Sequence, residues 1–153
     1  MHKIKASVLL AKGIDDDTRT IRDIIKTLPS KEGNIIWMYL TIKTNLDVED
    51  EIKIGFDIIQ VDEESDFGIE LGEFVVGRTK DKRKREEIFR KHGEPRGFKP
   101  DKGTSILPYR DIYTIGQRFP SLPYLKKGSY EFVVYEKDEK GKYILDTFQF
   151  EVV

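Results

Sequence analysis

Hydrophobic and polar residues alternate along several segments of the chain, a pattern typical of β-strands that bury one face. The segments with the clearest alternation are residues 3–10, 52–58, 130–134 and 144–152. Asp146 is the one polar residue that interrupts the apolar series of the last segment. Phe56 and Phe132 stand in the middle of their apolar series, and we therefore expect both to be buried in the core.

Two further segments are compatible with either a strand or a helix. Residues 34–44 are apolar on both faces, which fits a central strand covered on each side or a buried helix. Their β-branched and aromatic residues favour the strand. Residues 18–28 place three isoleucines and Leu28 at helical spacing, but most of the segment is β-branched, and we favour a strand there too.

One short helix is predicted in the second half of the chain. Two glutamates in residues 82–92 each precede a basic residue by four positions, in the order that stabilises a helix, and Gly93 follows as a stop. Residues 78–107 therefore form a long charged insertion between strands. Connections of this length are uncommon unless they are functional or disordered.

Polar turns separate the predicted strands. Residues 138–141 are expected to form a hairpin loop with Gly141 in the left-handed conformation, and residues 126–128 to form another turn. A length of 153 residues fits one domain. We predict a mainly β fold: a single antiparallel β-sandwich domain, residues 1–153, of about seven to eight strands, with one short helix in the long basic insertion.

Composition excludes several kinds of chemistry. The chain has no cysteine and only two histidines, so disulfides, thiolate zinc sites and a cysteine nucleophile are absent. It also lacks a phosphate-binding glycine motif and the Gly-x-Ser-x-Gly sequence that surrounds a hydrolase serine. We therefore expect a non-enzymatic protein without a cofactor.

Hydropathy and residue usage suggest where the protein works. No stretch approaches the ~20 apolar residues that span a membrane, and the apolar run at 6–11 is too short for a signal peptide. We expect a cytoplasmic protein that does not contact membranes. Lysine and glutamate are plentiful, whereas asparagine and glutamine total five, a bias reported for heat-adapted organisms, so we favour a thermophilic source.

The order of the segments resembles that of a family of small bacterial β-sandwich domains of unknown function. The likeness rests on a first strand at 6–11, an Asp-rich turn and a β-branched segment that ends in Leu28-Pro29. It continues with the paired-strand region 34–60, Phe119-Pro-Ser-Leu-Pro, Gly128-Ser-Tyr-Glu-Phe and a terminal strand. The resemblance implies a sandwich fold and no catalytic residues, and the basic insertion departs from it.

Charge is strongly polarised along the chain, although the net charge is only −1. Residues 78–102 contain eleven basic and five acidic residues, and residues 45–73 contain eleven acidic residues and only Lys53 as a base. The basic run suggests a contact with nucleic acid, in which cations meet phosphates and Phe98 stacks on a base. The residues expected to contact nucleic acid or another polyanion are Arg78, Lys80, Lys82, Arg83, Lys84, Arg85, Arg96, Phe98 and Lys99. The other interpretation is a solvated insertion, which the overall pI of 6.2 favours.

Acidic residues at alternate positions in two loops suggest a calcium site. Calcium needs six to eight oxygen ligands, which paired acidic loops at one end of a sandwich can supply. The residues expected to bind it are Asp15, Asp17, Asp62, Glu64 and Asp66. No complete calcium-loop motif accompanies them, and acidic turns are more often only solvated.

Three functions therefore remain open. The first is a non-enzymatic interaction or structural module with an unknown protein partner. The second is a nucleic-acid-contacting protein that uses residues 78–99, and the third is a calcium-dependent binding domain. Trp37, Tyr39 and the later tyrosines either line a ligand groove or, as is more common, belong to the core. A homo-oligomer is compatible with all three.

Overall fold

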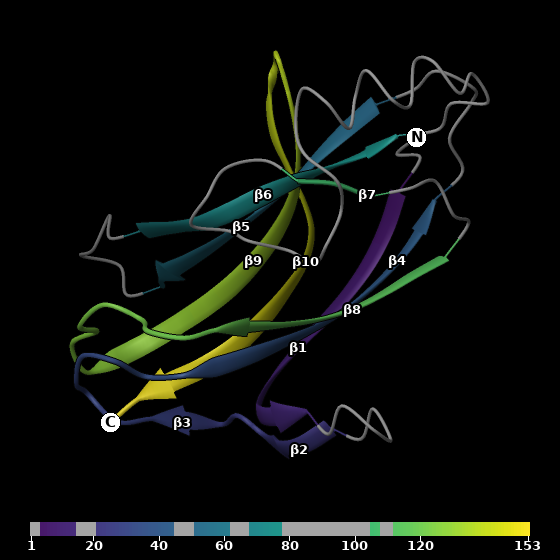
Figure 1. Cartoon of the computed structure of the whole chain (residues 1–153). Coiled ribbons are helices and arrows are strands. Elements are labelled where there is room, and N and C mark those ends of the chain that lie inside the picture. Colours follow the sequence, from purple (N-terminus) through teal and green to yellow (C-terminus); the bar gives the residue numbers. More distant parts are fainter. Residues whose placement is uncertain (1–3, 15–20, 45–50, 62–67, 78–104, 108–111) are drawn as a thin grey trace.

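The computed structural model describes residues 4–14, 21–44, 51–61, 68–77, 105–107 and 112–153. These residues form two sheets and no helix, so the prediction of a mainly β fold is confirmed (Figure 1). The four-stranded sheet has the order β2 (Ile21–Ile24), β1 (Ile4–Ile14), β4 (Ile36–Thr44) and β8 (Ile112–Phe119). The six-stranded sheet has the order β3 (Thr27–Leu28), β10 (Gly141–Val152), β9 (Gly128–Asp138), β5 (Glu51–Gln60), β6 (Gly68–Gly77) and β7 (Ser105–Leu107).

Neighbouring strands are antiparallel except at the two edges of the six-stranded sheet. There β3 runs parallel to β10, and β7 runs parallel to β6. Seven strands are eight residues or longer, whereas β2, β3 and β7 have four, two and three residues. Strands of two or three residues are too short to show a periodicity, which is why the sequence does not reveal β7, nor β3 as a strand separate from β2.

The predicted helix at 82–92 and most of the insertion at 78–107 lie outside the described residues. In the part of the chain that the structure describes, no helix is long and apolar enough to cross a membrane.

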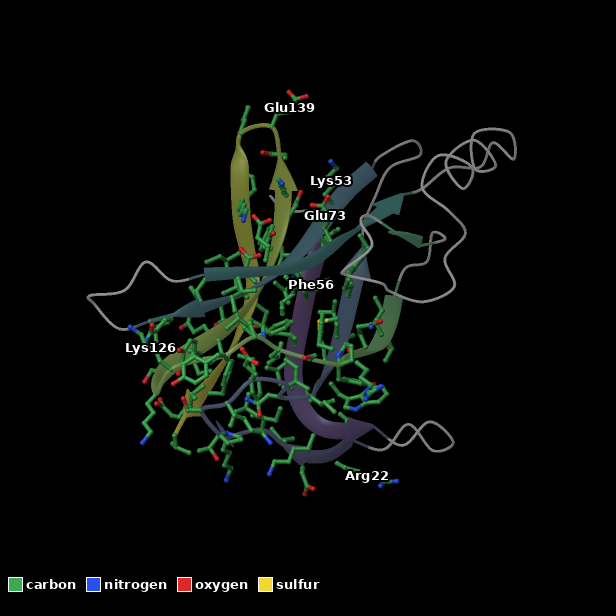
Figure 2. The ribbon with its side chains drawn as sticks, turned by 60° about the vertical axis from the view of Figure 1, so that its left-hand side comes forward. Arg22, Lys53, Phe56, Glu73, Lys126 and Glu139 are labelled. Carbon is green, nitrogen blue, oxygen red and sulfur yellow. The ribbon has the colours of Figure 1, made fainter. Side chains whose placement is uncertain are left out.

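The core lies between the two sheets and is rich in phenylalanine. Phe56 and Phe132 are fully buried, as their alternation predicts, and Figure 2 shows Phe56 in the interior. Their ring centroids are 6.1 Å apart, and Phe56 lies 5.5 Å from Phe74 on the next strand. Phe119 of the four-stranded sheet approaches Phe132 at 6.0 Å, so aromatic packing joins the two layers.

The two sheets approach each other where β1 lies beside β10 (Figure 1). β10 contains a bulge between Ile144 and Asp146 relative to its partner β9. The carboxylate of Asp146 accepts a hydrogen bond of 2.8 Å from the backbone N–H of Val8 on β1. The polar residue that interrupts the apolar alternation therefore links the two sheets through a backbone N–H group of β1.

The segment at 18–28 is extended where it is described, as the sequence favours. Residues 21–24 form β2 and residues 27–28 form β3, on different sheets. Asp23 has a φ of +52°, in the left-handed region, and Ile25 is buried with its N–H bonded to the Leu10 carbonyl at 2.9 Å. The irregular backbone between the two short strands explains why neither a clean strand period nor a clean helix period is visible.

The β9–β10 hairpin projects beyond the rest of the six-stranded sheet, with Glu139 at its tip (Figure 2). Asp138 Oδ1 accepts hydrogen bonds from the backbone N–H groups of Lys140 and Gly141, at 2.7 and 3.0 Å. Gly141 has a φ of +147°, so the predicted turn and its glycine are confirmed. At the other end of β9, the Tyr130 hydroxyl donates to the Lys126 carbonyl at 2.7 Å, beside the bend at Lys127 that precedes the strand.

Candidate functional site

The site residues expected from the sequence lie outside the described residues. This holds for the basic set, Arg78, Lys80, Lys82, Arg83, Lys84, Arg85, Arg96, Phe98 and Lys99. It also holds for the acidic set, Asp15, Asp17, Asp62, Glu64 and Asp66. Among the described residues, no group of three or more histidine, aspartate and glutamate side chains is placed to hold a metal ion. The nucleic-acid and calcium hypotheses for these loops stay predictions.

The described residues present two polar or aromatic arrangements on the outer faces of the two sheets. The first, the Lys142 cluster, consists of Asp57, Glu70, Tyr135 and Lys142 on the six-stranded sheet. Lys142 Nζ lies 3.2 Å from Asp57 and 3.6 Å from Glu70, and 4.5 Å above the Tyr135 ring. The Tyr135 hydroxyl donates to Asp57 Oδ1 at 3.1 Å. The cluster therefore joins β10 and β9 to β5 and β6.

A glycine makes room for this cluster. Gly55 lies opposite Tyr135 in the β5–β9 register, and the tyrosine ring occupies the space that a Cβ at Gly55 would need. Tyr135 is consequently only 4% exposed, although it lies on the outer face of the sheet. A glycine covered by a cross-strand aromatic ring is a recognised way to stabilise an extended glycine.

The protonation of the Lys142 cluster argues against acid–base or nucleophilic chemistry. Burial, helped by the neighbouring Asp57 carboxylate, raises the pKa of Tyr135 from 10.0 to about 12. Burial lowers the pKa of Lys142, but the hydrogen bond and charge of Asp57 outweigh it and raise that pKa above its ordinary value. A general acid or base works best with a pKa near the working pH, and a nucleophilic lysine needs a lowered one. The pKa values of Tyr135 and Lys142 are both raised instead, so the cluster is suited to holding strands together.

The second arrangement, the aromatic face, covers the outer side of the four-stranded sheet. In β4, Met38, Leu40 and Ile42 point inward and are fully buried, whereas the alternate residues Trp37 and Tyr39 are only partly buried. Trp37 lies in register with Ala11 of β1 and Arg118 of β8, and Ile24 of β2 extends the same row beyond Ala11. The next row consists of Leu9, Tyr39 and Gly116. Ala11, between Ile24 and Trp37, is fully buried. We define the aromatic face by the exposed and partly exposed residues of these rows: Leu9, Ile24, Trp37, Tyr39, Gly116 and Arg118.

Polar and basic residues border the aromatic face along β1, β4 and β8. Beyond Tyr39 follow a row of hydroxyl residues, Ser7, Thr41 and Thr114, and then the paired lysines Lys5 and Lys43. The described side of β1, β4 and β8 that carries the aromatic face contains Lys5, Lys43 and Arg118 and no acidic residue. The outer face of the six-stranded sheet differs, because among its described side chains five acidic residues accompany three lysines. These are Asp57, Glu70, Glu73, Glu131 and Glu151, and Lys53, Lys137 and Lys142.

The sequence gives only a partial signal for the aromatic face. The sequence predicts Trp37 and Tyr39 as either groove or core residues, whereas in the structure both are partly buried on the outer face of β4. Of the later tyrosines, Tyr130 and Tyr135 are buried, and Tyr124 is 55% exposed. Arg118 and Gly116 carry no sequence signal of their own, since their place beside the rings depends on the pairing of β8 with β4.

Comparison with known proteins does not assign the chain to a family. A scan against models of protein families found no match, and a search of curated proteins found no similar protein. The resemblance to small bacterial β-sandwich domains and the cytoplasmic location therefore stay predictions.

Proposed function

We propose that the protein is a non-enzymatic interaction module with a β-sandwich fold, and that it binds an anionic partner with the aromatic face. The observation that carries this proposal is the placement of Trp37, Tyr39 and Arg118 at neighbouring register positions on one outer sheet face. Tryptophan, tyrosine and arginine are the residue types that contribute most binding energy at protein surfaces. A polar border around an apolar centre is the usual anatomy of such a site.

Contiguity distinguishes this face from ordinary surface hydrophobes. Single exposed apolar residues are common and need no explanation, whereas a connected patch with a polar rim marks an interaction site. Ile24 is 54% exposed and lies in the same cross-strand row as Trp37, and Leu9 and Tyr39 lie in the adjacent row. Apolar residues of three strands therefore occupy two neighbouring rows on one face of the sheet.

The charge of the border favours an anionic partner. Lys5, Lys43 and Arg118 carry positive charge, and no acidic side chain neutralises them on the described part of this face. A two-fold dimer through the same surface would bring these cations against their own copies, which is unfavourable. The partner of this face is therefore expected to be a different molecule.

Binding to a panel of anionic polymers tests the proposal. The panel contains polyglutamate, a sulfated polysaccharide and a single-stranded oligonucleotide. At least one should bind, more weakly as salt increases, and Lys43→Glu should weaken that binding. Lys53→Glu is the matched control, since Lys53 is an exposed lysine in a strand of the opposite sheet. If no polymer binds, or if both substitutions weaken binding equally, the proposal is wrong.

A further inference from the structure

We infer that the anionic partner of the aromatic face is single-stranded nucleic acid. This inference rests on the proposed function and names the partner class for the same surface. It involves residues of β1, β4 and β8 and is independent of the basic segment at 78–99. The spacing of the two rings, the position of the cations and the openness of the edge strand each support it.

The spacing of Trp37 and Tyr39 suits an unstacked strand. The two residues are two positions apart on β4 and point to the same side, so the attachment points of their rings are roughly 6.6–6.8 Å apart. Successive nucleotides of a stacked B-form strand rise only about 3.4 Å. A single strand that opens its own stacking can place one base on each ring, whereas a duplex keeps its bases paired and stacked inside.

The cations lie at both ends of the ring pair. Arg118 is in register with Trp37, and the lysine pair Lys5 and Lys43 lies two rows beyond Tyr39, roughly 13 Å along the strand. Between the rings and the lysines lie the hydroxyl groups of Ser7, Thr41 and Thr114, which can bond to phosphate oxygens. A phosphate backbone running along β4 would meet positive charge before and after the stacked bases.

The strand next to Tyr39 places no side chain directly opposite its ring. β8 is an edge strand in the described part of the four-stranded sheet, and its residue opposite Tyr39 is Gly116, which has no side chain. Gly116 therefore puts no side chain between the Tyr39 ring and a base that approaches from the β8 side. An acidic protein would also meet the cations, but lysine is depleted at protein–protein interfaces, and the lysine-bordered ring pair matches a nucleic-acid platform better.

Trp37 is the only tryptophan of the chain, so its fluorescence reports on this face alone. We expect (dT)12 and (rU)12 to quench this fluorescence on titration, and a matched 12-base-pair duplex to bind more weakly. Tyr39→Ala should weaken single-strand binding roughly 5- to 150-fold, the loss expected for one stacked base. Tyr124→Ala is the control, because Tyr124 is an exposed tyrosine outside the aromatic face.

A second variant keeps the test decisive if Tyr39→Ala does not fold. Lys43→Glu changes an exposed residue and should lower the slope of log affinity against log salt by about 0.7, the value of one phosphate contact on a single strand. Quenching by polyglutamate but not by oligonucleotides would overturn this inference and leave the proposed function standing. Oligonucleotide binding without a change in Trp37 fluorescence, or equal duplex binding, would also overturn it. If no polymer affects Trp37 or binds, both proposals fall.

Discussion

Replacing Gly55 with alanine is expected to destabilise the protein, because the ring of Tyr135 occupies the space that the new methyl group needs. The ring cannot move away freely. Its hydroxyl is bonded to Asp57 at 3.1 Å, and Lys142 lies over its face at 4.5 Å. An alanine at this position must therefore either displace Tyr135 and break these contacts or push β5 away from β9.

The expected cost is about 1–3 kcal/mol of unfolding free energy, the range for adding a methyl group to a well-packed site. Alanine is intrinsically favoured over glycine inside a strand by roughly 0.5–1 kcal/mol. A loss of stability in Gly55→Ala would therefore come from the clash with Tyr135 and not from strand preference. Gly13→Ala on β1 provides the control. A Cβ at Gly13 would meet only the Cβ of Arg22, at 4.0 Å, which is an ordinary contact. That variant should be neutral or slightly stabilised.

A double-mutant cycle in urea tests the cause directly. In a Tyr135→Val background the ring is gone, and Gly55→Ala should then cost nothing or add stability. The coupling free energy between the two positions should be at least about 1 kcal/mol. The reasoning is refuted if the cost of Gly55→Ala persists without the tyrosine, or if Gly55→Ala and Gly13→Ala change stability equally.

Two further predictions follow from the core and from the Lys142 cluster. Phe56→Ala removes a fully buried ring and should lower the unfolding free energy by about 3–5 kcal/mol in denaturant titrations, and a loss well under 1 kcal/mol would contradict its place in the core. The raised pKa of Tyr135 means that the folded protein keeps the phenol proton to a higher pH than the unfolded chain does. The free energy of unfolding that this pKa difference contributes is complete below pH 10 and is lost as pH rises towards about 12. Tyr135→Phe should therefore lose stability less steeply than the wild type over that pH window, and parallel curves would contradict the assignment.

The sequence predicts those parts of the fold that depend on neighbours in the chain. Alternation places Phe56 and Phe132 in the core, and turn chemistry places Gly141 in the hairpin loop, because both signals are local. Asp146 shows where local signals end. Its place opposite Val8 depends on a bulge and on β1 lying beside β10, and residues so far apart in sequence meet only in the folded chain.

The same pattern that predicts β4 also conceals the aromatic face. Apolar residues on both sides of residues 34–44 indicate a strand covered on each side, yet only the side with Met38 and Leu40 is fully buried. Hydrophobicity does not separate a ring that serves packing from a ring that serves binding, because both gain free energy by leaving water. The neighbours of a ring help to separate the two cases, and Arg118 stands in register with Trp37 only because β8 pairs with β4. Counting charged residues along the chain locates the basic insertion at 78–102. It does not locate the basic surface formed by Lys5, Lys43 and Arg118, because these residues are far apart in sequence and share a sheet face only after folding.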